Sequence, residues 1–297
     1  MLCLTPHVKR FKLRKLYAIS DIHLSYAANR EALEALPFYP DDWLILAGDV
    51  GETLEQLQFA LSVLCPRFAQ VLWVPGNHDL WCLDAYEPRG VAKYERLVSL
   101  CQQCGVLTPE DSYIHWPEDP TLVLAPLFLL YDYSFRPATV PLEDAVDWAA
   151  KAGIVFRDEI VLYPNPYPSR YAWCQERLRI TEQRLQAVQA PGLKFILINH
   201  FPFQAYPLGF MRHPEISLWS GTCQTEDWHQ RFPTRVAIYG HLHMRGTYYR
   251  NGVRFEEVSL GYPQDWRAAK GVVGYLREIW PGPQGETPEH AEMTWRF

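Results

Sequence analysis

Histidines, carboxylates and one asparagine recur along the chain in short clusters whose residue types suit transition-metal binding. Histidine nitrogens combined with carboxylate and amide oxygens favour Mn, Fe or Zn, whereas an all-oxygen set favours Mg or Ca and thiolates favour structural zinc. Because the candidates outnumber the ligands of a single ion, we predict two divalent metal ions, with manganese preferred. The seven candidate ligands are Asp21, His23, Asp49, Asn77, His200, His241 and His243.

Two of the clusters share one spacing. Asp21 and His23 are separated by a single residue, and so are His241 and His243. Residues two apart on a regular strand face the same side, and a break in the strand after Ser20 would equally turn the first pair inward. Two metal ions ~3.5–4 Å apart can bind the attacking and the leaving oxygen of a displacement, so hydrolysis of a phosphate ester is the reaction we expect.

The elements that must position these residues follow from the apolar pattern. Short apolar runs of strand length precede the clusters, at residues 16–20, 43–47, 71–74, 194–198 and 235–239. Helical patterns lie between them at residues 28–36, 53–65, 91–104 and 171–188, with Thr53 as an N-cap. Strands alternating with helices predict an α/β fold, in which polar site residues collect at the carboxyl ends of the strands.

The remaining segments have different patterns. Residues 246–250 and 254–260 are typical of strands joined by the hairpin turn Asn251-Gly252, and residues 272–280 are a further strand candidate. The segment of roughly residues 80–191 separates the third cluster from the fourth and contains proline-rich stretches. We interpret this segment as an insertion that partly covers the site, within a single domain spanning residues 1–297.

Composition excludes several classes of protein. A net charge of −6 argues against general nucleic-acid binding, which requires a basic surface. Seven cysteines, an odd and scattered number, do not suggest a secreted disulfide framework. The basic N-terminus lacks the apolar region of a signal peptide, and no apolar run approaches the ~18 residues that a membrane span needs. We therefore expect a cytoplasmic protein that does not enter a membrane.

Taken in order, the clusters resemble the motifs of the calcineurin-like metallophosphoesterases. The order and the rough spacing match over residues 16–243, and each motif follows a predicted strand. The resemblance implies a four-layer α/β/β/α sandwich with two central mixed sheets flanked by helices. The motifs are DxH at residues 21–23, GDxxE at 48–52, GNHD at 76–79, a lone histidine at 200 and GHxH at 240–243.

The same resemblance assigns roles to the matching positions. His78 is similar to the family's non-ligand histidine, which contacts the phosphate and can protonate the leaving oxygen. Glu52 occupies the position of an acidic residue that orients this histidine, and Asp79 is the alternative; the sequence leaves both open. The first metal would be held by Asp21, His23, Asp49 and His243, and the second by Asp49, Asn77, His200 and His241, with Asp49 bridging.

One departure from the wider group bears on the substrate. Its protein Ser/Thr phosphatases carry Arg-Gly after the acidic residue of the GD motif, followed by GNHE, whereas this chain has Thr53-Leu54 and GNHD. We therefore predict an enzyme that hydrolyses a phosphodiester or phosphomonoester of a small molecule or nucleotide. The alternatives are a phosphoprotein Ser/Thr phosphatase and a non-catalytic scaffold, the latter disfavoured because no candidate ligand is missing. The sequence leaves open the physiological ester, the native metal and the oligomeric state.

Overall fold

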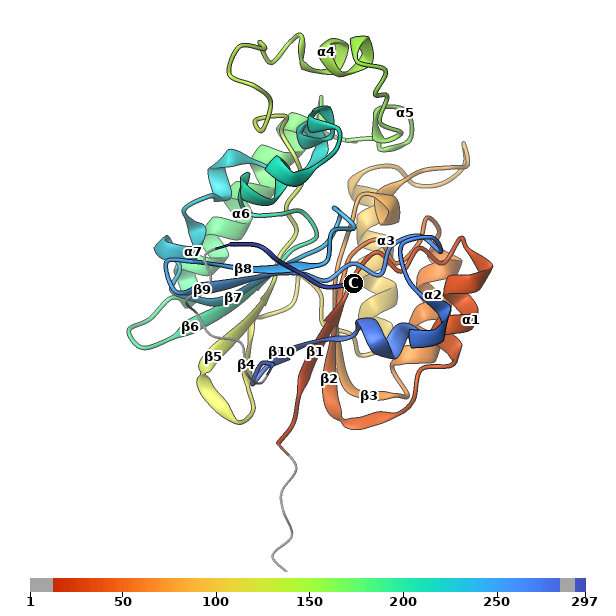
Figure 1. The fold of residues 1–297 in the computed structure, drawn as a ribbon, viewed down its shortest axis with the longest axis vertical. Helices are drawn as coiled ribbons and strands as arrows, with labels where there is room; N and C mark the ends of the chain where they lie inside the picture. The colour runs from red at the N-terminus through yellow and green to blue at the C-terminus, as the bar shows by residue number, and fades with distance from the viewer. Residues whose placement is uncertain (1–12, 284–291) are drawn as a thin grey trace, which may run out of the picture.

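The computed structural model describes residues 13–283 and 292–297, so most of the basic N-terminal stretch considered above, residues 1–12, lies outside the described residues. Two β-sheets occupy the centre of the molecule (Figure 1). Within the described residues, the first sheet has four strands in the order β10-β1-β2-β3. Its strands are β1 (Leu16–Ile19), β2 (Tyr39–Ala47), β3 (Phe68–Val74) and β10 (Arg277–Trp280).

The second sheet of the described chain has seven strands in the order β11-β8-β9-β7-β6-β5-β4. Both sheets are mixed: β1, β2 and β3 are parallel with an antiparallel β10, and β5, β6, β7 and β9 are parallel with antiparallel neighbours. The strands of the second sheet are β4 (Ile114–Trp116), β5 (Asp119–Pro126), β6 (Lys194–Ile198), β7 (Thr234–Tyr239), β8 (Gly246–Arg250), β9 (Val253–Glu257) and β11 (Thr294–Trp295).

Helices cover the outer faces of both sheets. Figure 1 shows α1 (Ala27–Glu34), α2 (Leu54–Leu64) and α3 (Val91–Gln103) beside the first sheet, and α6 (Arg170–Val188) and α7 (Trp228–Arg231) beside the second. The predicted four-layer sandwich is thereby confirmed. Short 3₁₀ helices are η1 (His78–Leu80), η2 (Tyr206–Phe210), η3 (Pro214–Trp219), η4 (Cys223–Thr225), η5 (Ala268–Lys270) and η6 (Val272–Tyr275).

Alternation along the strands divides the core into layers. In β2, Ile45 and Ala47 belong to a buried cluster that joins the two sheets, whereas Leu44 and Leu46 belong to the larger cluster that packs with the helices. Successive side chains of a strand point to opposite faces, so a strand buried on both faces is apolar throughout. This explains why the strands that carry the site appear as continuous apolar runs in the sequence.

Most predicted elements are present, including the hairpin turn, and one predicted strand is only partly formed. The hairpin between β8 and β9 turns at Asn251 and Gly252, whose φ angles of 52° and 75° are those of a type I′ turn. The strand expected over residues 272–280 is only half correct, because η6 follows Gly271 and only Arg277–Trp280 pairs with β1. The 3₁₀ helix η6 takes up Val272–Tyr275, and Gly271 at a φ of 56° precedes its first residue.

The segment of residues 80–191 contributes to the layers as well as to a separate region. It supplies α3 to the outer face of the first sheet and β4 and β5 to the second sheet. Residues 127–169, which connect β5 to α6, are called the cap segment below; they contain α4 (Ala145–Lys151) and α5 (Asp158–Val161), which lie away from the sheets at the top of Figure 1. Among the described residues, no helix has the length and apolarity needed to cross a membrane.

Candidate active site

The candidate ligands meet because the carboxyl ends of the two sheets are tied together. Ser20, directly after β1, forms a bridge with Ser259, which follows β9 of the other sheet. Its backbone N–H donates to the carbonyl of Val258 at 3.0 Å, and its carbonyl accepts from the N–H of Leu260 at 2.8 Å. The loops that follow β1, β2 and β3 therefore lie against those that follow β6 and β7.

These loops hold their side chains in strained backbone conformations. A positive φ costs roughly 1–2 kcal/mol for a residue with a Cβ and persists where the surrounding structure imposes it, commonly at functional sites. Five of the seven described non-glycine residues with positive φ are candidate ligands, namely Asp21 (52°), His23 (39°), Asp49 (52°), His241 (73°) and His243 (53°). This concentration of positive φ angles at the predicted ligands does not depend on the motifs, and it favours a functional role for these loops.

Glycine permits a close approach in the same loops. A Cβ added at Gly76 would overlap the carboxylate of Asp49, and one at Gly240 would overlap the carboxylate of Asp21. Neither position could carry a side chain without displacing a candidate ligand. The glycines of the GNHD and GHxH motifs are thus explained by the packing of the loops against the carboxylates.

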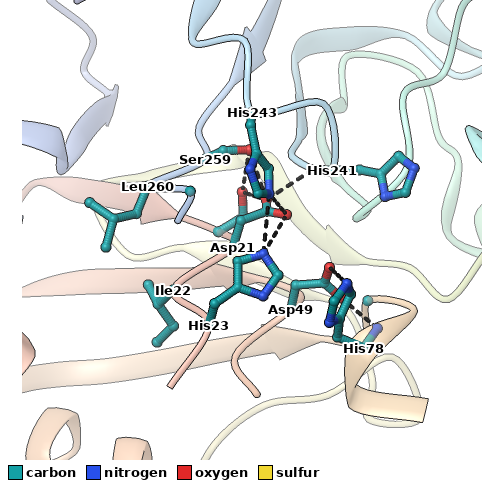
Figure 2. Close-up of polar contacts among 12 residues, drawn as sticks. Asp21, Ile22, His23, Asp49, His78, His241, His243, Ser259 and Leu260 are labelled. Carbon is teal, nitrogen blue, oxygen red and sulfur yellow. Dashed lines mark hydrogen bonds and ion pairs between the residues drawn. The ribbon is translucent and has the colours of Figure 1, made fainter. Parts of the chain in front are cut away.

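Asp21, His23 and His243 form the first ligand cluster. Nε2 of His23 lies 3.1 Å from Nε2 of His243, and Nε2 of His243 lies 3.2 Å from Oδ1 of Asp21. Figure 2 shows the three side chains converging on one point from two separate loops. Oδ2 of Asp21 is turned away and accepts hydrogen bonds from the hydroxyls of Ser20 and Ser259 at 2.6 and 2.8 Å. One carboxylate oxygen is therefore held by the protein and the other faces the histidines.

Asp49, His200 and His241 form the second cluster, and Asn77 borders it. Nε2 of His200 lies 3.4 Å from Oδ2 of Asp49 and 3.2 Å from Oδ1 of Asn77. The potential ligand atoms of Asp49, His200 and His241 all lie within 4.8 Å of one another. Asp49 also belongs to a group with His23 and His78, so it lies between the two clusters as a bridging ligand would.

The donor atoms fit metal ions in three respects. Nε2 of His241 is buried and has no hydrogen-bond partner among the described residues. Nδ1 of His200 lies 2.9 Å from the carbonyl oxygen of Ala47, and Nδ1 of His243 lies 3.1 Å from Oδ2 of Asp265. An oxygen of either kind can only accept, so the proton belongs on Nδ1 and the Nε2 lone pair is presented to the cluster.

Burial and neighbouring charges set the protonation of the clusters. Burial lowers the pKa of His23 and of His241 to about 3, helped by the neighbouring imidazoles, so both rings are neutral at pH 7. Burial also opposes ionisation of Asp49, but His200 and His78 outweigh it and hold the pKa of that carboxyl below its ordinary value. Burial lowers the pKa of His200 and of His243, but Asp49, Asp21 and Asp265 outweigh it and raise these pKa values to about 9 and about 10, so a divalent ion would displace a proton from each of these two rings.

His78 lies at the edge of the clusters rather than within them. Its Nε2 is 3.9 Å from Oδ2 of Asp49, and its ring stacks on Trp81 with centroids 3.6 Å apart. Oε1 of Glu52 lies 3.7 Å from Nδ1 of His78. Asp79 instead accepts backbone N–H groups from both adjoining loops, so of the two carboxylates left open by the sequence it is Glu52 that faces the histidine ring.

The sequence motifs did not identify three residues that contact the candidate site. Asp265 accepts from His243, Asp158 contacts Asn77, and Tyr262 stacks on His23 with centroids 4.6 Å apart. Each lies far along the chain from its partner and belongs to no cluster of ligand-type residues. Because only tertiary packing brings them to the site, no local spacing in the sequence could have revealed them.

A cavity of about 380 Å³ opens beside the clusters. His78 and four of the candidate ligands line it, together with Phe156 from the cap segment and apolar residues of other loops; the four ligands are Asp49, Asn77, His241 and His243. Exposed Arg212 also borders the cavity. The lining thus combines candidate metal ligands with apolar side chains, as suits an ester with an uncharged arm. The apolar part is lined by Phe156, Met211, Ile216, Leu242 and Met244.

The chain matches one phosphoesterase family and is similar to known proteins. The model of the calcineurin-like phosphoesterases matches residues 14–245. The acyl-carrier-protein phosphodiesterase PptH of Mycobacterium tuberculosis is 44% identical over 274 residues, which are 91% of this chain and 84% of PptH. The crystal structure of that phosphopantetheinyl hydrolase has a TM-score of 0.87 and 43% identity, and the match covers 92% of this chain and 98% of the solved one. A solved protein of Thermus thermophilus is 13% identical with a TM-score of 0.45, over 84% of this chain and 90% of its own.

Proposed function

This chain belongs to the calcineurin-like phosphoesterase family, and from that premise we propose that it is a phosphodiesterase that releases phosphopantetheine from an acyl carrier protein. Family membership and the similarity to PptH together confirm the predicted enzyme class, a phosphoric ester hydrolase. The proposal of a carrier protein is supported by the similarity to PptH, which extends over nearly the whole chain.

The position of Asp49 carries the proposal. Its carboxylate belongs to one ligand group with His200 and His241 and to another with His23 and His78, and it lines the cavity. Asp21, His23, Asp49 and His243 would hold one divalent ion, and Asp49, Asn77, His200 and His241 the other, with manganese as the first choice. When bound, such a pair activates water at neutral pH and stabilises the charge that develops on phosphate during displacement. The lone pairs directed into both clusters support this assignment.

His78 supplies the proton chemistry of the chain itself. Its ring lines the cavity and lies beside Asp49, but His78 is not among the ligands of the second cluster. Stacking on Trp81 fixes the plane of the ring, and Glu52 lies near Nδ1, so Nε2 is directed toward the clusters. We assign His78 to donate a proton from Nε2 to the oxygen of the departing group, with Glu52 as its orienting partner.

The cavity can hold one of the two groups that are esterified to the phosphate of a diester. The apolar wall of the cavity can contact an extended, uncharged arm, while the second group remains outside the mouth. A protein can occupy that outer position, because only the phosphate and the arm need to enter. Phe156 brings the cap segment to this wall, and we propose that the cap segment partly covers the site.

This proposal replaces the small-molecule or nucleotide substrate expected from the motifs. The motifs describe the metal ligands and the proton donor, which act on the phosphate and contact neither esterified group. Absence of the Arg-Gly pair argued against phosphoprotein phosphatases, whose substrates are monoesters. A diester on a carrier protein agrees with that observation and has a protein as one of its two groups.

The proposal is tested with purified, metal-reconstituted protein and a carrier protein bearing phosphopantetheine. Mass spectrometry should show conversion to the carrier protein without the arm, with release of phosphopantetheine. Asp49→Ala should abolish the conversion, and His78→Ala should reduce it by ~10²–10⁴-fold, the usual contribution of a general acid. Hydrolysis of bis-p-nitrophenyl phosphate without any action on the carrier protein would reject the carrier-protein substrate while leaving the phosphodiesterase chemistry in place.

A further inference from the structure

α5 of the cap segment carries a carboxylate into the catalytic centre. Asp158, the first residue of α5, is fully buried. Its Oδ1 accepts a hydrogen bond from Nδ2 of Asn77 at 3.0 Å and another from Nε1 of Trp81 at 2.6 Å. Asn77 is a candidate metal ligand, and the Trp81 ring stacks on His78. Oδ1 of Asp158 is therefore bonded both to a candidate metal ligand and to the ring that supports the proton donor.

The contact with Asn77 determines which way its amide points. A carboxylate can only accept hydrogen bonds, so the NH₂ group of Asn77 must lie on the side of Asp158. The amide oxygen then lies on the opposite side, where Oδ1 is 3.2 Å from Nε2 of His200 in the second cluster. Without Asp158 the amide could rotate and present NH₂, which cannot bind a cation, to the cluster.

The contact with Trp81 acts on the other half of the site. An indole has one hydrogen-bond donor and no acceptor, so a buried Nε1–H needs a single acceptor as its partner. Binding Asp158 fixes the rotation of the indole in its plane, and the ring then supports His78 from one face at a centroid distance of 3.6 Å. The guanidinium of Arg157 lies 4.8 Å from the same ring.

We infer that Asp158 is a positioning residue, which aims the amide oxygen of Asn77 at the second metal cluster and holds the Trp81 ring against His78. The inference rests on the proposed metal centre for the first effect and is independent of it for the second. Outer contacts of this kind typically change metal affinity by 10–100-fold. The cap segment thus completes the catalytic centre as well as lining the cavity.

The neighbouring Glu159 provides a matched control on the same helix. It accepts hydrogen bonds at Oε1 from Tyr133 and from Trp219, both at 2.8 Å, and it pairs with Arg170. These partners belong to the cap segment and the elements that pack with it, and none of them is a candidate ligand. Glu159→Gln therefore disturbs the anchoring of α5 without removing a contact to Asn77 or Trp81.

The experiment compares Asp158→Ala, Asp158→Asn and Glu159→Gln with the unmodified chain. Metal titration of the stripped proteins by calorimetry should show two binding events in the unmodified chain. Asp158→Ala should weaken one of them by about 10–100-fold and leave the other unchanged. Asp158→Asn keeps an acceptor oxygen and should stay within about threefold of the unmodified chain, as should Glu159→Gln.

A second readout needs no metal. In ¹⁵N-tryptophan-labelled, metal-free protein, the indole N–H signal of Trp81, assigned with Trp81→Phe, should move upfield in Asp158→Ala because its bond to a carboxylate is lost. Wild-type metal affinity and an unmoved signal in Asp158→Ala would overturn the inference. So would an equal loss of affinity in Glu159→Gln, which would assign the effect to general loosening of α5. Failure of the unmodified chain to bind two ions would instead reject the proposed metal centre, and the indole signal would still report on Asp158.

Discussion

Oδ2 of Asp265 lies 3.1 Å from Nδ1 of His243 and also accepts the backbone N–H of Tyr262 at 2.8 Å. The second bond fixes the carboxylate in its loop, so the carboxylate in turn fixes the imidazole. The His243 ring therefore keeps its proton on Nδ1 and directs the Nε2 lone pair toward Asp21 and His23. A carboxylate behind a ligating histidine also makes the histidine a stronger ligand.

Asp265→Ala should weaken the ion held by the first cluster by about 10–100-fold and leave the second unchanged. Without an acceptor at Nδ1, the proton of His243 can move to Nε2, and that tautomer has no Nε2 lone pair for an ion. Calorimetric titration of the metal-free variant measures both affinities. Equal weakening of both ions, or of neither, would show that Asp265 does not act through His243.

Asp79 has a structural task that Glu52 lacks. Its two oxygens accept backbone N–H groups of Asp49, Val50, Gly51 and Gly76 at 2.9–3.2 Å, and the side chain is buried. Asp79→Ala leaves these donors unsatisfied, and we expect the free energy of unfolding to fall by about 3–5 kcal/mol. Urea denaturation at pH 7 measures the loss. A loss below about 1 kcal/mol would show that water replaces the carboxylate.

Glu52 should show the reverse behaviour. Glu52→Gln retains the shape of the side chain and removes its charge near His78, so kcat should fall by about 10–100-fold while the free energy of unfolding changes by about 0.5 kcal/mol or less. Turnover of bis-p-nitrophenyl phosphate and urea denaturation of the same preparation test both halves. Unchanged turnover would remove Glu52 from the catalytic set.

The candidate ligands could be identified from the sequence because each lies within four residues of the end of a buried strand. Residues 195–198 of β6 are apolar and buried, and His200 comes two residues after the last of them. Chain geometry alone places such residues at the carboxyl edge of a parallel sheet. The resemblance to the family then predicted that two sheets pack against each other, which the periodicity of the sequence does not determine.

Other parts of the fold gave no readable signal. β5 begins with Asp119-Pro120 and ends at Pro126, and prolines normally argue against a strand inside a sheet. Its buried centre is short, and no ligand-type cluster follows it. Asp158 and Asp265 reach the site only through tertiary packing, so their positions depend on the folding of the loops rather than on a local pattern.

Glu256 gives the protein a sensitivity to acid that is separate from the active site. It is fully buried in β9 and forms ion pairs with Arg254, Arg277 and Arg296. Burial raises the pKa of the carboxyl, but the three arginines outweigh burial and lower the pKa below its usual value of 4.5. Because the folded pKa is depressed, the stabilisation is complete above about pH 4.5 and is lost as pH falls through the folded pKa.

Glu256→Gln should therefore lower the free energy of unfolding by about 1.5–3 kcal/mol at pH 7, because it removes the buried charge that accepts from these partly exposed arginines. The difference between variant and unmodified chain should shrink as the pH falls below about 4.5 toward the lowered pKa of Glu256, because protonation then neutralises Glu256 in the unmodified chain as well. Thermal unfolding followed by circular dichroism across this range measures the difference. A constant difference would show that Glu256 does not titrate there.

Arg212 offers a test that separates recognition of a large substrate from the chemistry at phosphate. The residue is exposed at the border of the cavity, outside both ligand clusters, so its removal leaves the core intact. A hydrogen bond to a charged group contributes about 1.5–3 kcal/mol, so Arg212→Ala should raise KM for the phosphopantetheinyl carrier protein by at least about tenfold. Turnover of bis-p-nitrophenyl phosphate, which is too small to extend past the mouth, should not change.

Arg179→Ala, which removes an exposed arginine paired with Glu176 on α6, serves as the control and should affect neither substrate. Equal effects of Arg212→Ala on both substrates would place Arg212 at the phosphate instead, and no effect on either would exclude this side of the cavity from contact with the carrier protein.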